Sequence, residues 1–136
     1  MKEVAQQRSR IMRAVKSANT GPEMVVRSLA HRMGYRFRLH RKDLPGKPDL
    51  VFPRRRKVVF VHGCFWHGHD CVRGARVPLR NRAYWKRKIT RNRVRDQTNP
   101  SLLKALGWKS LVIWECETKI EAKLQKRLSK FLGLLF

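Results

Sequence analysis

The sequence predicts an α/β fold, a three-layer-like sandwich in which a mixed central β-sheet is flanked by helices. Short apolar runs rich in β-branched residues alternate with longer stretches of helical periodicity, as expected for a sheet covered by helices. The chain has 136 residues, enough for one hydrophobic core, so we expect a single domain over residues 1–136. Residues 61–71 hold most of the histidine and cysteine, which makes this loop the candidate site.

The first long helix is expected to begin at Thr20 and end at Gly34. Pro22 fits a first helical turn, and Glu23 adds favourable negative charge there. We interpret Glu23 first as a helix-terminal charge, with a role in the site as the alternative. Residues 8–15 predict a short basic helix, either a packed lid or an arm that reaches a ligand, and the sequence leaves both open.

Three strands are expected next. Residues 35–39 alternate apolar and basic side chains, which is typical of a half-exposed strand. Two buried strands, 49–52 and 58–61, are separated by a basic turn and form a hairpin. This hairpin places Asp49, at the start of one strand, beside His62, at the end of the next.

The second half of the chain predicts two helices, a strand and a last helix. The helices cover residues 81–97 and 100–106, with Gly107 closing the shorter one. Residues 108–114 form a strand, on which we assign Trp108 and Trp114 to the core, and which delivers Cys116 just past its end. Residues 120–135 form an amphipathic helix that packs on the sheet.

The charge of the chain points to a polyanionic partner. There are 33 lysines and arginines against 9 acidic residues, a formal net charge of +24, and the cations run from Arg8 to Lys130. Neutralising phosphates releases counterions and supplies binding energy, so nucleic acid is favoured over a merely solvated surface or a membrane-surface role. The start of the chain has no apolar signal-like region and no run reaches membrane-spanning length, so we expect a cytoplasmic protein.

The loop after the second buried strand has the composition of a zinc site. Cys64, His69 and Cys71 supply three ligand-grade groups, and Cys116 is the only cysteine left to be the fourth. Four such ligands complete a tetrahedral shell and leave no position for water, so we expect a structural zinc ion. Free or buried thiols are the alternative.

Asp49 follows a proline and opens a strand, which is the first half of the PD-(D/E)xK nuclease motif. The second acid and the lysine of that motif are missing, since residues 60–62 read Phe-Val-His. One carboxylate, the backbone carbonyl of Val61 and water would then hold the metal, which magnesium tolerates because it keeps several waters. His62 and His67 suit proton transfer near neutral pH, one as base for the attacking water and one near the leaving oxygen or phosphate; support of the zinc site is the alternative.

Two large aromatic residues, Phe65 and Trp66, lie inside this polar loop, where core packing does not explain them. On a basic protein, large apolar side chains can wedge between base pairs. Trp85, on the basic helix, could join them.

Together these residues resemble the very-short-patch mismatch repair endonucleases, the Vsr family of the PD-(D/E)xK-like nuclease superfamily. The resemblance covers nearly the whole chain and is most specific in the run His62-Gly63-Cys64-Phe65-Trp66-His67. It extends to the following segments: 9–14, 44–49, 68–71, 77–78, 84–89, Asn92, 107–108 and 114–116.

The resemblance implies a restriction-endonuclease-like fold and an enzyme that nicks double-stranded DNA 5′ to the thymine of a T:G mismatch, which arises when 5-methylcytosine deaminates. It implies magnesium at Asp49, water activation by His67, assistance at the phosphate by His62 and support of the active site by Glu23. The implied zinc ligands are those derived above. The implied DNA contacts are intercalation by Phe65, Trp66 and Trp85, insertion of Met12 from an amino-terminal arm over residues 1–18, and contacts of Lys88 and Asn92 with the mismatched pair.

One position departs from the familiar members of the family, which have threonine before the first histidine where this chain has Val61. A backbone carbonyl ligand survives that change, and a hydroxyl contribution does not. Two other functions stay open: a restriction-type endonuclease of the same fold, and a zinc-stabilised nucleic-acid-binding module without catalysis. We expect a monomer, since the sequence shows no coiled coil or evident dimer face, and repair proteins that act after the nick.

Overall fold

The computed structural model describes residues 20–64, 67, 69, 71 and 80–133. The elements in chain order are α2 (Gly21–Arg32), β1 (Arg38–Leu39), β2 (Leu50–Phe52), β3 (Lys57–His62), α3 (Arg82–Ala105), β4 (Lys109–Trp114), the 3-10 helix η1 (Glu115–Lys119) and α4 (Glu121–Leu132). The sheet has the order β1-β2-β3-β4. The first three strands pair antiparallel, whereas β3 and β4 pair parallel, which confirms the predicted mixed sheet.

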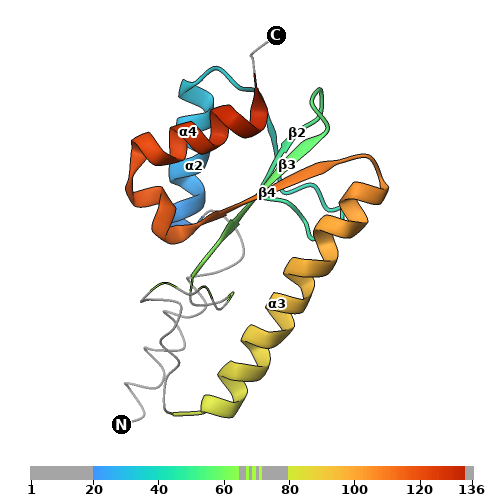
Figure 1. Cartoon of the computed structure of the whole chain (residues 1–136), viewed down its shortest axis with the longest axis vertical. Coiled ribbons are helices and arrows are strands. Elements are labelled where there is room, and N and C mark those ends of the chain that lie inside the picture. Colours follow the sequence, from blue (N-terminus) through green and yellow to red (C-terminus); the bar gives the residue numbers. More distant parts are fainter. Residues whose placement is uncertain (1–19, 65–66, 68, 70, 72–79, 134–136) are drawn as a thin grey trace.

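Alternate side chains of the central strands enter two separate cores. On one face, Leu50, Phe52 and Val59 pack with the apolar sides of α2 and α4. On the other face, Val51, Val58 and Phe60 pack with Leu103 of α3 and with two further buried residues, Leu44 and Trp108. The period-two alternation of a strand therefore builds the predicted three layers, with α2 and α4 on one side and α3 on the other (Figure 1).

Helix α2 begins as its sequence predicts. The Thr20 hydroxyl accepts a hydrogen bond from the Glu23 backbone N–H at 3.3 Å, and Pro22 occupies the first turn. Val26, Leu29 and Ala30 form its buried side. Glu23 is also buried, with 2% of its surface exposed, so this first-turn carboxylate faces the protein and not solvent.

The loop before β2 is shaped by a glycine. Gly46 has a positive φ of +80°, and a Cβ there would lie 2.7 Å from the Asn99 side chain and 3.0 Å from the Phe60 ring. The loop can therefore lie against both α3 and the sheet only if this residue has no side chain. It leads directly into Asp49, whose backbone N–H donates to the Val59 carbonyl at 3.1 Å.

Three element predictions were wrong in their bounds. Only Arg38 and Leu39 of the expected strand 35–39 pair with β2. We predicted two helices between residues 81 and 106, but α3 is continuous through Pro100. Proline removes one backbone donor at a cost of about 3 kcal/mol, and the complete burial of Leu103, one turn later, offsets part of that cost. The last helix ends at Leu132, before Gly133 with φ of +76°.

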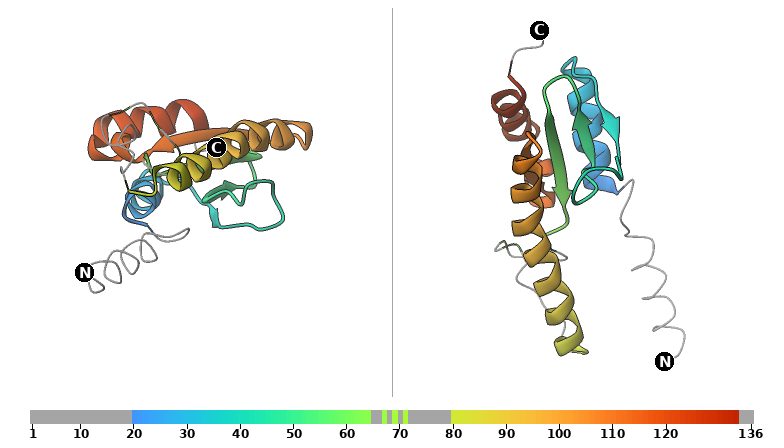
Figure 2. Two further views of the ribbon diagram at one scale, coloured as in Figure 1. Left: turned by 90° about the horizontal axis from the view of Figure 1, so that it is seen from below. Right: turned by 90° about the vertical axis from the view of Figure 1, so that its right-hand side faces the viewer.

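Helix α3 extends well beyond the sheet. Its carboxyl-terminal end packs beside β4, while its amino-terminal half continues past the ends of β3 and β4, as the two views of Figure 2 also show. Within the described part of the chain, no helix has the length and apolar character needed to cross a membrane.

Candidate functional site

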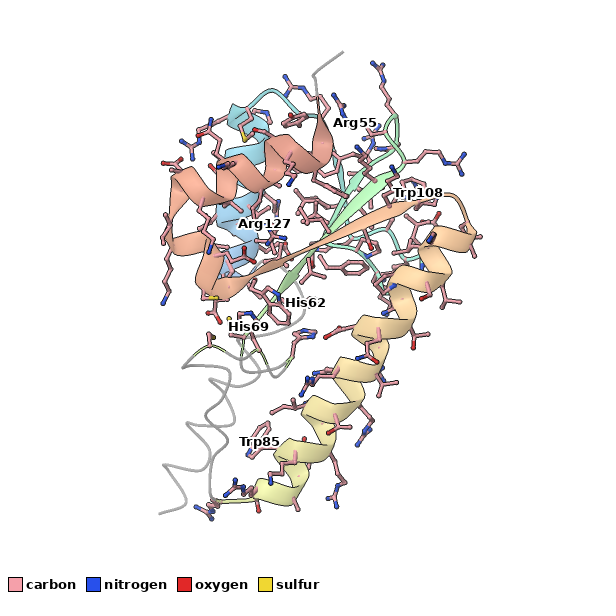
Figure 3. All side chains as sticks on the ribbon, viewed as in Figure 1. Arg55, His62, His69, Trp85, Trp108 and Arg127 are labelled. Carbon is pink, nitrogen blue, oxygen red and sulfur yellow. The ribbon has the colours of Figure 1, made fainter. Side chains whose placement is uncertain are left out.

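Three groups of polar side chains gather at the carboxyl end of β3 and its neighbours. In each group, the possible metal-ligating atoms lie within 4.8 Å of one another. The groups are Cys64, His69, Cys71 and Cys116; His62, His67 and Asp96; and Glu23, His40 and Asp49. Figure 3 shows His62 and His69 together at this end of the sheet, opposite the end that carries Arg55 and Trp108.

The ligand atoms of the cysteine-histidine group lie close enough together to share one metal ion. Zinc bonds of about 2.3 Å to sulfur and 2.0 Å to nitrogen imply an S–N edge of about 3.5 Å in a tetrahedral shell, and Cys116 Sγ lies 3.7 Å from His69 Nδ1. Burial raises the pKa of the Cys64 thiol to about 12, so a bound cation is needed to stabilise its thiolate. The Cys64 and Cys116 segments are also joined directly, because the Cys116 N–H donates to Cys64 Sγ at 3.4 Å.

The 3-10 helix η1 positions Cys116, and the sequence did not reveal it. The chain turns sharply after β4, where the Trp114 N–H donates to the Glu117 carboxylate at 3.0 Å. Glu115 of the same turn accepts from the Cys64 N–H at 3.4 Å. The predicted four ligands therefore come together, although they belong to two segments 45 residues apart in sequence (71 to 116).

The second group pairs the two histidines with an aspartate that the sequence analysis did not assign. The His62 and His67 rings stack with centroids 3.9 Å apart and planes 3° apart. Asp96 of α3 lies 2.7 Å from His67 Nδ1 and 3.7 Å from His62 Nε2. The sequence could have pointed to Asp96, because it is the one acidic residue among the many lysines and arginines of residues 81–105.

His62 is held in its neutral form. Only 6% of its surface is exposed, and burial, followed by the neighbouring His67, lowers its pKa to about 4. Its Nδ1 is buried without a hydrogen-bond partner among the described residues. An imidazole in this state neither repels a positive charge on His67 nor carries one itself at neutral pH.

The third group brings two carboxylates together. The Asp49 carboxylate accepts a hydrogen bond from the Val61 N–H at 2.6 Å, so the predicted proximity of Asp49 to the end of β3 is present. Glu23 lies beside it and 3.4 Å from the Arg27 guanidinium. Burial and then the nearby Glu23 raise the pKa of Asp49 to about 7, as expected where two acids share a buried site.

Trp114 corrects one of our expectations. We assigned it to the core, but it is only partly buried, and its ring contacts are with three histidines. It stacks on His69 with centroids 4.1 Å apart and meets the edges of His62 and His67 at 5.3 and 6.3 Å. Trp114 therefore separates the cysteine-histidine group from the histidine pair. Trp108 is buried in the core, as predicted.

The residues expected to contact DNA lie only partly within the described structure. Each residue of an α-helix is rotated by about 100° from the one before it. Around the axis of α3, Trp85 and Asn92 therefore lie within about 40° of Asp96, and Lys88 lies about 80° from it. Since Asp96 reaches His67, this side of the helix leads from the histidine pair towards Trp85, near the start of α3 (Figure 3). Met12, Phe65 and Trp66 lie outside the described residues.

Comparison with known proteins gives a consistent set of relatives. Residues 3–73 match the family model described as DNA mismatch endonuclease Vsr. The chain is 54% identical over 127 residues to the type II nicking enzyme V.XorIIP of Xanthomonas oryzae pv. oryzae, covering 93% of each protein. It is 42% identical over 123 residues to the type II nicking enzyme V.NmeAIP of Neisseria meningitidis, covering 90% of this chain and 87% of the relative. It is 41% identical over 117 residues to the DNA mismatch endonuclease Vsr of Escherichia coli K12, covering 86% and 74%.

Proposed function

The chain belongs to the Vsr family of DNA mismatch endonucleases, and on that premise we propose that it nicks one strand of a duplex 5′ to the thymine of a T:G mismatch. The observation that supports the chemistry is that the end of β3 serves both groups: the Val61 N–H donates to the Asp49 carboxylate, and the next residue, His62, stacks on His67, which pairs with Asp96. Two of the relatives are named nicking enzymes, which supports cleavage of a single strand.

The Glu23 and Asp49 carboxylates fit a hard divalent cation such as magnesium, and the Val61 carbonyl is the proposed backbone ligand beside them. When bound, magnesium would neutralise charge on the scissile phosphate and on the leaving oxygen. The valine at position 61 leaves this backbone ligand unchanged. Asp49 must lose its proton to bind the ion, and its pKa of about 7 allows that near neutral pH.

His67 is the proposed general base. The Asp96 carboxylate can only accept, so the His67 nitrogen that faces it at 2.7 Å must carry a proton. In the neutral ring Nε2 is then the unprotonated nitrogen, which can take the proton of an attacking water. Asp96 is then a positioning residue that also stabilises the imidazolium formed in the step.

His62 assists without changing its charge. With a pKa of about 4, it is neutral at physiological pH, and it can donate one N–H to a phosphate oxygen or to the leaving oxygen. Its stacking on His67 holds both rings parallel, so the two nitrogens that act on the substrate keep a fixed separation. Fixed geometry of this kind lowers the entropic part of the barrier.

Recognition of the mismatch is assigned to α3 and to the residues around it. Trp85, Phe65 and Trp66 would insert beside the mismatched pair, Met12 of the arm over residues 1–18 would enter from the other groove, and Lys88 and Asn92 would contact the pair. A mismatched pair costs less to unstack, so selectivity begins as a difference in deformation energy. The exposed cations of α3 would bind phosphates on either side: Lys86, Arg87, Arg91, Arg93 and Arg95.

The zinc proposed for Cys64, His69, Cys71 and Cys116 is structural, because four protein ligands leave no coordination site for substrate. It would tie the loop that carries His67 to the end of β4. The loop that presents the catalytic base would then be held rigidly.

A nicking assay tests the proposal. A labelled duplex with one T:G pair and its T:A control are incubated with the protein in magnesium and then in EDTA. We expect a magnesium-dependent nick 5′ to the thymine of the T:G duplex only. Cleavage of both duplexes would favour a restriction-type endonuclease, and binding with no cleavage in zinc-loaded protein would leave only a binding module.

A further inference from the structure

We propose that His40 is a nitrogen ligand of the divalent cation held by Asp49 and Glu23, which makes this site bind manganese more tightly than magnesium. The inference rests on the proposed function, since it concerns the same metal. It adds a ligand that belongs neither to the nuclease motif around Asp49 nor to the loop that holds the proposed zinc ligands. The site would then prefer a divalent ion of the first transition series and would bind magnesium more weakly.

The distance between His40 and Glu23 is that of neighbouring ligands in an octahedral shell. Metal bonds of about 2.1 Å imply about 3.0 Å between adjacent ligand atoms, and His40 Nε2 lies 3.1 Å from each oxygen of Glu23. One ligand atom of each of the three residues lies within 4.8 Å of the others, so their side chains can reach a shared ion.

The fold directs His40 to this position. Leu39 of β1 faces Leu50 of β2, so the next pair in the antiparallel register is His40 with Asp49, and the His40 N–H donates to the Asp49 carbonyl at 3.3 Å. This hydrogen bond holds the backbone of His40 beside that of Asp49, just past the end of β1. The His40 ring then reaches the Glu23 carboxylate, which belongs to the same group as Asp49.

The backbone of His40 adds a second indication. Its φ is +49°, in the left-handed region that costs free energy for residues with a side chain. Conformations of this kind gather at functional sites, where the surrounding structure compensates for them. Here the strained residue carries the imidazole that contacts Glu23, a carboxylate with 2% of its side chain exposed.

The preference for metals follows from the ligand types. Carboxylates and water suit magnesium and manganese equally well, whereas an imidazole nitrogen favours transition metals. Removing the imidazole should therefore weaken manganese binding much more than magnesium binding. A purely structural ion pair between His40 and Glu23 would produce no such selective change.

The test uses the full-length, zinc-loaded protein with ¹⁵N-labelled histidine, and Mn²⁺ as the probe. Pulsed electron paramagnetic resonance detects ¹⁵N nuclei bonded directly to the manganese. The variant is His40→Gln, and the matched control is His31→Gln, which changes an exposed histidine on α2. We expect ¹⁵N coupling in the unmodified protein and in the control, its loss in His40→Gln, and a fall of at least about tenfold in manganese affinity with little change for magnesium.

Bound manganese without ¹⁵N coupling in the unmodified protein would overturn the proposal, and so would coupling that persists in His40→Gln. Unchanged zinc content and thermal unfolding of His40→Gln exclude misfolding as the cause of a loss. If that variant does not fold, Glu23→Gln takes its place: coupling is retained at high manganese concentration if His40 is a ligand, and absent if it is not. Nicking of the T:G duplex in magnesium is scored separately, so failure of the endonuclease function is distinct from failure of the His40 ligand.

Discussion

Two clusters at the same end of the sheet differ in the chemistry of their donor atoms. The group built on Cys64 and Cys116 offers three sulfurs and one imidazole, whereas the group built on Asp49 and Glu23 offers carboxylates and the His40 ring. Sulfur and imidazole suit zinc in a closed tetrahedral shell, and carboxylates suit an ion that keeps exchangeable waters. The cysteine cluster is therefore suited to fixing the loop, and the carboxylate cluster is suited to binding the metal ion that takes part in the reaction.

The largest effect is expected from breaking the carboxylate cluster. Asp49→Ala removes the carboxylate that accepts from the Val61 N–H and would hold the metal. We expect nicking of a T:G duplex to fall by at least about 10³-fold, with DNA binding and zinc content retained. The matched control is Asp43→Ala, an exposed aspartate in the same loop. An Asp49→Ala protein that nicks at the normal rate would remove Asp49 from the mechanism.

Breaking the other cluster should act on stability first. Cys116→Ser removes one of the four proposed ligands, so we expect the protein to lose zinc and its free energy of unfolding to fall by several kcal/mol, on the order expected for a structural site. Metal analysis and thermal unfolding measure the two effects. Lys119→Ala, exposed on the same 3-10 helix, serves as the control. Full zinc occupancy in Cys116→Ser would show that the fourth ligand lies elsewhere.

A more conservative change tests how Asp96 of α3 positions the proposed base, His67. Asp96→Asn keeps the shape of the side chain but can donate to His67 Nδ1, which then favours the wrong tautomer. We expect the maximal rate of nicking to fall about 100-fold, with little change in the affinity for DNA. Gln97→Ala, an exposed neighbour, should behave as the unmodified protein. A fall in affinity with an unchanged rate would assign Asp96 to DNA binding.

The smallest effect concerns the charge of His62. Its pKa of about 4 lies below the ordinary value of 6.5, so the ring stays neutral while the same residue in the unfolded chain takes up a proton. The contribution of His62 to stability is therefore complete above pH 6.5 and is lost as the pH falls from 6.5 towards 4. The chemical shift of its ring protons, followed by NMR, should not change between pH 8 and 5.5. A midpoint near 6.5 would contradict the buried, neutral state.

Local patterns predicted much of the fold and the site. The hairpin that brings Asp49 to His62 follows from two short apolar runs separated by a basic turn. The four proposed zinc ligands were found because thiols and imidazoles are rare and stand close together in the chain. The bounds of α3 were missed, because local propensity treats Pro100 as a boundary and the burial of Leu103 is decided by the sheet.

Three site residues depended on tertiary structure. Asp96 reaches His67 because α3 continues past the end of β3, and the backbones of His40 and Asp49 meet because of the register between β1 and β2. Trp114 lies on a strand whose pattern predicted a core position. It meets His62 through the pairing of β3 with β4, and His67 and His69 through the residues that follow β3. No spacing within the sequence fixes any of these three contacts.

One experiment tests directly whether the carboxylate cluster is catalytic and the cysteine cluster is structural. Zinc content and T:G nicking are measured on one sample in magnesium, after gel filtration into magnesium-free buffer, and after magnesium alone is restored. We predict that removing magnesium abolishes nicking while zinc stays bound, and that magnesium alone restores the full rate. Nicking that survives the removal of magnesium, or that returns only when zinc is added, would contradict the assignment of the carboxylate cluster to catalysis and of the cysteine cluster to structure.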